Sequence, residues 1–116
     1  MRITGITFVG SRTDARPAMA QFLREVLGLS PAAPTAGMDA DVFDLPDGSS
    51  FAVARGVPPD EDDRTVGFSV DDLDQARAAL EAAGVWVDDE VSVNERFRYL
   101  HFRAPDGHLY ELVEGR

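Results

Sequence analysis

The sequence predicts one α+β domain made of two similar halves, each a βαβββ module with the order strand, helix, weak strand, strand and strand. A Pro-Asp-Gly tripeptide at residues 46–48 recurs 59 residues later at 105–107, and a helix-ending glycine at Gly28 recurs 56 residues later at Gly84. Such a long-period self-similarity is typical of a repeated unit. We therefore expect a single domain over residues 1–116, with modules at 1–56 and 64–116. The two modules should form a curved mixed sheet with helices on its outer face.

Two segments have the apolar periodicity of amphipathic helices. The first begins near Pro17, which suits the first helical turn, and ends before Gly28. In the second, Asp72 and Gln75 resemble a capping box, and Gly84 ends the helix. The predicted inward-facing residues are Met19, Phe22, Leu23, Val26 and Leu27 in the first helix and Leu73, Ala76, Leu80 and Ala83 in the second.

The remaining apolar segments are short and rich in β-branched and aromatic residues, which favours strands. Each Pro-Asp-Gly lies between two of them and therefore predicts a hairpin. The stretch 30–38 is expected to be a weak strand or a loop. The predicted strands are 3–9, 42–45, 51–54, 66–70, 86–93, 97–103 and 109–113.

Alternation along a strand assigns its two faces. In the strand 66–70, Phe68 points toward a helix and Gly67 points to the other face. In the first strand, Phe8 is expected under the helix, with Thr7 and Val9 opposite. The second face carries mostly small residues, which predicts a cleft. Phe8, Phe22, Phe51, Phe68 and Tyr110 are predicted core residues, whereas Phe97 and Tyr99 share a face with His101 and Arg103.

The composition excludes several classes of protein. Apolar residues make up 44% and charged residues 28%, as in globular domains. The formal net charge of −10 repels a phosphate backbone, so nucleic acid is not an expected partner. No apolar run is long enough for a membrane span, and the absence of cysteine excludes disulfides and thiol chemistry. Because no leader segment is visible, a cytoplasmic location is expected, and the acidic run 60–63 is interpreted as a solvated connector.

Four segments that span nearly the whole chain resemble the vicinal oxygen chelate superfamily, which includes glyoxalase I, bleomycin-resistance proteins and extradiol dioxygenases. This resemblance implies the glyoxalase-like fold. Because that fold hosts unrelated chemistries, it does not by itself assign a function. The segments are Phe22-Leu23-Arg24-Glu25-Val26-Leu27-Gly28-Leu29, Phe68-Ser69-Val70-Asp71-Asp72-Leu73-Asp74, Ala82-Ala83-Gly84-Val85 and Phe102-Arg103-Ala104-Pro105-Asp106-Gly107-His108-Leu109-Tyr110-Glu111-Leu112.

In the metal enzymes of this family, paired strands of both modules supply His, Gln or Glu ligands to one divalent metal. The resemblance maps those positions onto Thr7 (or Phe8, if the alignment shifts by one), Ala52, Thr65 and Glu111. Only Glu111 is a good ligand, and a catalytic centre normally uses three or more such side chains. We therefore predict no bound metal and no other cofactor, and metal-dependent glyoxalase or dioxygenase activity is disfavoured.

The two histidines, His101 and His108, lie beside the second Pro-Asp-Gly. A favourable hairpin register would place His101 beside Glu111, where the carboxylate would stabilise the charged imidazole and fix its orientation. Such a pair is a candidate acid–base couple. The alternative is an ordinary strand histidine beside a leftover carboxylate.

Two classes of function follow. The first is a metal-free protein of the glyoxalase/bleomycin-resistance type, which holds an organic ligand, cationic or aromatic, in the cleft between the modules. The second is a metal-independent isomerase, lyase or hydrolase with Glu111 or His101 as general base, and with Arg98 or Arg103 holding an anionic group. A partner protein with an empty cleft is a third possibility. The predicted cleft residues are Thr7, Ala52, Thr65, Trp86, Phe97, Tyr99, His101, Arg103 and Glu111.

Two further expectations concern surfaces. Trp86 suits either stacking on a ligand or a dimer interface, and the sequence does not decide between them. A homodimer is expected, because exposed strand edges are usually covered by pairing and because family members of this length commonly dimerise.

Overall fold

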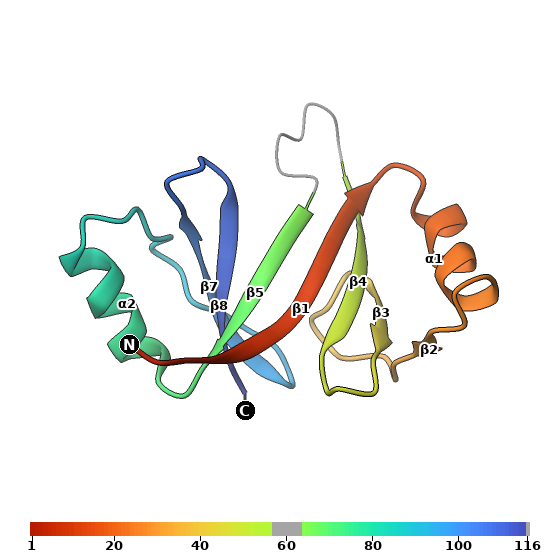
Figure 1. The fold of residues 1–116 in the computed structure, drawn as a ribbon, viewed down its shortest axis with the longest axis horizontal. Helices are drawn as coiled ribbons and strands as arrows, with labels where there is room; N and C mark the ends of the chain where they lie inside the picture. Colours follow the sequence, from red (N-terminus) through yellow and green to blue (C-terminus); the bar gives the residue numbers. More distant parts are fainter. Residues whose placement is uncertain (57–63, 116) are drawn as a thin grey trace.

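The computed structural model describes residues 1–56 and 64–115; the predicted connector at 60–63 lies outside these residues. It contains one eight-stranded sheet and two helices (Figure 1). The elements are β1 (Ile3–Thr13), α1 (Arg16–Glu25), β2 (Ser30–Pro31), β3 (Asp41–Asp44), β4 (Ser50–Arg55), β5 (Arg64–Val70), α2 (Leu73–Ala82), β6 (Ser92–Val93), β7 (Phe97–Arg103) and β8 (Leu109–Gly115).

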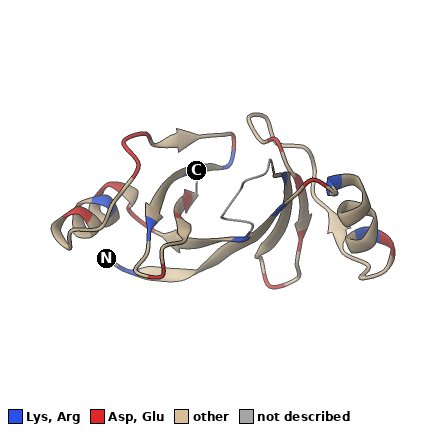
Figure 2. Ribbon diagram, turned by 90° about the horizontal axis from the view of Figure 1, so that it is seen from above, with Lys and Arg blue, Asp and Glu red and all other residues tan. Residues whose placement is uncertain are grey.

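The sheet has the order β2-β3-β4-β1-β5-β8-β7-β6, so each half of the chain contributes one half of it. The central strands β1 and β5 are antiparallel, and each pairs on its other side with the last strand of its own half, in parallel. Both Pro-Asp-Gly turns join antiparallel hairpins, β3–β4 and β7–β8. Figure 2 shows the two helices at opposite ends, outside the curved sheet. The predicted α+β fold, a curved mixed sheet with outer helices, is confirmed.

Both helices end close to the glycines that the sequence indicates, α2 two residues before Gly84 and α1 three residues before Gly28. Gly28 and Gly84 follow α1 and α2 with φ angles of 71° and 75°, a left-handed conformation that only glycine adopts readily. At the start of α2, the Asp72 carboxylate accepts a hydrogen bond of 3.0 Å from the backbone N–H of Gln75. Neither of the described helices is long and apolar enough to cross a membrane.

Each half has its own hydrophobic core between its helix and the outer face of the sheet. Burying this apolar surface is the main stabilising contribution to the fold. Because the cores lie on the helical side, the opposite, concave face of the sheet remains available for a site. The buried residues are Ala20, Leu23, Phe43 and Val53 in the first half and Val70, Leu73, Ala76, Leu80, Leu100 and Leu112 in the second, with Phe51 and Phe68 packed against them.

The predicted apolar stripe of the first helix is only partly correct. Leu23 is buried, but Phe22 is 44% exposed, Val26 69% and Leu27 56%. Helix α1 ends at Glu25, so Val26 and Leu27 no longer follow its periodicity. Phe22 lies within the helix, but its exposed side chain shows that it is not a core residue.

The predicted strand at 86–93 is also mostly wrong. Only Ser92–Val93 forms β6, and Val87 makes one isolated bridge to Phe102. Val87 and Val91 instead pack as irregular chain against the core under α2. The apolar residues that suggested a strand are therefore explained by core packing and not by strand pairing.

Candidate functional site

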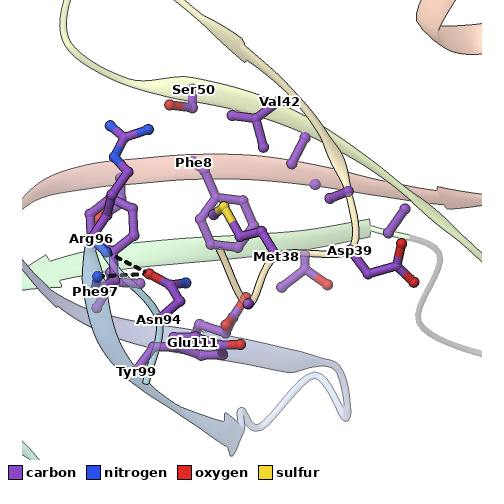
Figure 3. A pocket seen from close by; sticks show the side chains of 18 of the residues that line it. Phe8, Met38, Asp39, Val42, Ser50, Asn94, Arg96, Phe97, Tyr99 and Glu111 are labelled. Atoms are coloured by element: carbon purple, nitrogen blue, oxygen red, sulfur yellow. Dashed lines mark hydrogen bonds between the residues drawn. The ribbon is translucent and has the colours of Figure 1, made fainter. Parts of the chain in front are cut away.

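A cavity of about 270 Å³ lies on the concave face of the sheet (Figure 3). This volume is at the small end of ligand sites, which range over roughly 300–1,000 Å³. Both halves line it: β1, β3 and β4 from the first, β5, β7 and β8 from the second, and one loop from each, at residues 37–40 and 94–96. The cleft between modules that the small residues predict is thus present as a cavity.

The first strand enters this cavity in a register that simple alternation does not predict. The pairing of β1 with β5 shifts between Ile6 and Phe8, as at a β-bulge, which turns the following side chains over. Phe8 therefore lines the cavity instead of the core, and Val9, which pairs with Val66, does not line it. The predicted faces of Phe8 and Val9 are wrong for this reason.

The ring of Phe8 lies across two glycines of the concave face. A Cβ added at Gly67 would overlap Cε1 of Phe8, closer than any real Cβ contact, and one added at Gly10 would lie 3.2 Å from its Cε2. A residue without a side chain at position 67 is therefore what lets the ring occupy this place.

The strand registers show which positions in the two halves are equivalent. In the first half Gly10 pairs with Ala52, and in the second half Gly67 pairs with Glu111, both in parallel ladders. Ala52 is therefore the counterpart of Glu111. Two residues earlier on the central strands, Phe8 is in the same way the counterpart of Thr65.

The positions that correspond to the family's metal ligands are thus Phe8, Ala52, Thr65 and Glu111, and all four line the cavity. Three of them are a phenyl ring, a methyl group and a hydroxyl. Within the described ranges, no group of three or more His, Cys, Asp or Glu side chains is placed to hold a metal ion. This donor set does not fit the divalent metal of the family's metal enzymes.

Glu111 and His101 face each other at the end of the cavity formed by the second half. They are direct partners in the β7–β8 ladder, and Nε2 of His101 lies 3.5 Å from Oε1 of Glu111. Glu111 is 8% exposed. The register that brings this pair together is the one the sequence suggested.

The charge states of this pair differ from the sequence expectation. Burial raises the pKa of Glu111 to about 7, although the charge of Arg12 acts in the opposite direction. Burial also lowers the pKa of His101 and outweighs the opposing effect of the Asp88 carboxylate. The expectation that the carboxylate would stabilise a charged imidazole is therefore wrong, because desolvation is the larger effect. Near neutral pH the imidazole is neutral, and Glu111 populates both its protonated and its ionised form.

Other predicted cleft residues divide into two groups. Thr7, Phe97 and Tyr99 line the cavity, as do Ala52, Thr65, His101 and Glu111. Trp86 and Arg103 do not line it: Trp86 is 56% exposed, and Arg103 donates a hydrogen bond to the carbonyl of Gly107.

The arginines of the cavity are also not the ones expected. Arg98, one of the two predicted anion-holding residues, forms ion pairs with Glu114 at 2.8 Å and Asp74 at 3.4 Å, outside the cavity. Arg12 and Arg96 line the cavity instead.

Sequence reasoning missed the loop residues of the site. Asn94 is buried, and its side-chain oxygen accepts hydrogen bonds from the backbone N–H groups of Arg96 (2.8 Å) and Phe97 (2.9 Å). The Glu95 carboxylate accepts another, of 3.1 Å, from the N–H of Ala36 in the loop of the first half. An asparagine just before a strand is a turn signal, and this was the one clue to these residues in the sequence.

Comparison with solved structures shows the same fold in several proteins. Methylmalonyl-CoA epimerase from Mycobacterium tuberculosis has a TM-score of 0.80 at 18% identity, covering 98% of this chain and 89% of that chain. A variant of Streptomyces coelicolor methylmalonyl-CoA epimerase in complex with 2-nitronate-propionyl-CoA has a TM-score of 0.75 at 22% identity, covering 97% and 98%. A superfamily member from Vibrio splendidus 12B01 has a TM-score of 0.67 at 15% identity, covering 94% and 97%. At such identities the likeness concerns the fold alone.

Sequence comparison gives the family. No curated protein sequence matches this chain significantly. The family model described as Glyoxalase/Bleomycin resistance protein/Dioxygenase superfamily matches residues 5–112, which is nearly the whole chain. The chain therefore belongs to the glyoxalase/bleomycin resistance protein/dioxygenase superfamily.

Proposed function

We propose that this protein binds a small organic molecule in the cavity between its two halves, without a metal ion. The observation that carries the proposal is the buried carboxyl of Glu111, which faces the cavity beside His101. Because this carboxyl lies at the cavity wall, a polar group of a ligand can form a hydrogen bond with it. Such a bond contributes about 0.5–1.5 kcal/mol net, and more when one of the two groups is charged.

The remaining lining suits a flat organic body. Phe8, Phe97 and Tyr99 line the cavity with aromatic side chains, together with the small side chain of Ala52. Aromatic pairs that stack or meet edge to face contribute about 0.5–1.5 kcal/mol beyond their area. These walls would bind the apolar part of a ligand, while Glu111 fixes its orientation.

Calorimetry at pH 7 in two buffers of different ionisation enthalpy tests this proposal, after a thermal-shift screen has provided a ligand. A ligand at a hundredfold excess over its dissociation constant stabilises the folded state by about 2.7 kcal/mol. Because Glu111 titrates near this pH, we expect binding to take up or release a fraction of a proton. Glu111→Gln should abolish this proton exchange, and His108→Gln, which alters an exposed histidine outside the cavity, should leave it unchanged.

Two results would refute the proposal. One is the absence of any stabilising ligand among aromatic, anionic and cationic compounds. The other is a saturable shift with Ni²⁺ or Mn²⁺ that disappears in Glu111→Gln, because the carboxyl would then be a metal ligand.

A second candidate function is a metal-independent isomerase, lyase or hydrolase in which Glu111 is the general base. The raised pKa of Glu111 favours it, because a base works best when its pKa is close to the working pH. Exchange of C–H protons next to the carbonyl of small carbonyl compounds in D₂O, followed by NMR, tests this function. General-base catalysis contributes roughly 10²–10⁴-fold, so Glu111→Gln should lose at least a hundredfold in exchange rate while it still binds the compound.

The homodimer and the two-module division remain proposals. The edge strands β2 and β6 contain only two residues each, so exposed edges give little reason for pairing. Light scattering after gel filtration measures the oligomeric state directly.

A further inference from the structure

We infer that the ligand is an organic anion, with its negative group bound by Arg96 at the mouth of the cavity and its planar body against Phe97 and Phe8. This inference rests on the proposed function and specifies the ligand class of that same site. It differs from the cationic ligand that the sequence left open, because the charge inside the cavity differs from the net charge of −10 of the whole chain.

Among the residues that the structure describes, acidic side chains lie on both helices, on β3 and β8 and in the loops (Figure 2). Of the two carboxyl groups that line the cavity, Asp39 is paired with Arg16 at 3.1 Å. The other, Glu111, is held partly protonated by burial. Two guanidinium groups, Arg12 and Arg96, line the same cavity, and Arg12 already has an interaction partner. Arg96 is therefore the positive charge that remains for a ligand.

Arg96 is the cation that the structure presents to a ligand. Its guanidinium carbon lies 5.2 Å from the centre of the Phe97 ring, and within the part of the chain that the structure describes it forms no ion pair with a carboxylate. A guanidinium donates two parallel hydrogen bonds to a carboxylate or phosphate and stacks on an aromatic face at the same time. The side chain is exposed, so an anion reaches it from solvent.

The backbone beneath Arg96 is fixed before any ligand arrives. The buried Asn94 holds the N–H groups of Arg96 and Phe97, and Glu95 ties the same loop to Ala36 in the other half of the chain. A binding group on an anchored backbone loses less conformational entropy on binding than one on a free loop.

Arg96 also stands at the junction of two cavities. A second cavity of about 360 Å³ shares five lining residues with the first and has one carboxyl group of its own, that of Asp71. Arg96 precedes His101 by five residues, roughly 16 Å along an extended strand. A ligand that reaches both the rim and Glu111 is therefore longer than a single small ring. The shared residues are Thr7, Ser50, Arg96, Phe97 and Val113, and Figure 3 shows Arg96 beside Phe97.

Three compounds with the same bicyclic ring and different charge test this inference: 2-naphthoate, 2-naphthamide and 2-naphthylmethylammonium. We expect calorimetry at pH 7.5 to show that naphthoate binds about tenfold more tightly than the amide, and that the ammonium compound binds most weakly. Arg96→Gln should weaken naphthoate binding about tenfold and leave amide binding unchanged. Arg2→Gln is the matched control, because it removes the same charge from an exposed residue outside both cavities and should leave all three affinities unchanged. 2-Naphthyl phosphate, run in parallel, shows whether the site prefers a phosphate or a carboxylate.

Several outcomes would overturn the inference. Tightest binding of the ammonium compound would mean that the negative charge of the whole chain determines which ligand charge is preferred. The proposed binding function would still stand. Equal losses in Arg96→Gln and Arg2→Gln would show a general charge effect without a specific contact. If none of the naphthyl compounds binds while another ligand binds with proton exchange through Glu111, the ligand class is wrong and the proposed function is right. If no compound of any kind binds, both fail.

Discussion

Replacing Glu111 with Gln should stabilise the protein at pH 8 and leave its stability unchanged at pH 4. In the folded state burial raises the pKa of Glu111 from 4.5 to about 7. Between the two pKa values of Glu111, the unfolded chain releases the carboxyl proton and the folded chain keeps it. The free energy of unfolding therefore falls as the pH rises through this range. One pKa unit corresponds to about 1.4 kcal/mol, so the full effect is about 3 kcal/mol.

The assay is thermal and urea unfolding of parent and variant at pH 4, 6 and 8, followed by circular dichroism. Comparing the two proteins at each pH cancels the contributions of all other titrating groups. For a domain of this size, 3 kcal/mol corresponds to a rise of the melting temperature of roughly 10 °C at pH 8. Glu90→Gln, at an exposed residue, should show no such pH dependence. A Glu111→Gln variant that is less stable than the parent at pH 8 would refute the reasoning, because it would mean that the ionised carboxylate stabilises the fold.

Three other predictions follow from the same structure. Gly67→Ala should destabilise the protein by about 1–3 kcal/mol in urea unfolding, since the new methyl group overlaps the ring of Phe8. Adding Phe8→Ala should relieve most of this overlap. Gly5→Ala, where a Cβ meets nothing within 4 Å, should not cause this loss of stability. Asp72→Ala should lose about 1 kcal/mol of unfolding free energy through the lost N-cap of α2, and an unchanged urea midpoint would contradict this. His101→Gln should gain stability relative to the parent as the pH falls below 6.5, the opposite direction to Glu111→Gln, because burial of the imidazole destabilises its charged form; equal gains at pH 5 and pH 8 would argue against it.

The sequence predicts the parts of the fold that depend on local signals. The glycines that end both helices, the Asp72 cap and the Pro-Asp-Gly hairpins are each encoded within a few residues, and all are found where predicted. The facing pair His101 and Glu111 could also be predicted from the sequence, because a tight turn limits the register of the two hairpin strands to few choices.

The rest depends on contacts that no local pattern encodes. The bulge in β1 places Phe8 in the cavity, and a period-two alternation has no means of detecting it. Arg103 ends the correctly predicted strand β7, and Trp86 lies beside it in a segment that is not a strand, yet neither residue lines the cavity. The charge states of His101 and Glu111 follow from how deeply the pair is buried, which the sequence does not express.

The matching registers of the two halves also show that the two walls of the cavity differ chemically at equivalent positions. Ala52 and Glu111 occupy equivalent places on opposite walls, and so do Phe8 and Thr65. A duplicated scaffold with identical linings would accept a ligand in two opposite orientations related by its internal pseudo-symmetry. Here one wall presents a methyl group and a ring, and the other presents a carboxyl and a hydroxyl. An unsymmetrical molecule therefore has a single favoured orientation, with its polar end toward the second half, and a reaction at that end would act on one of its faces and not on the other.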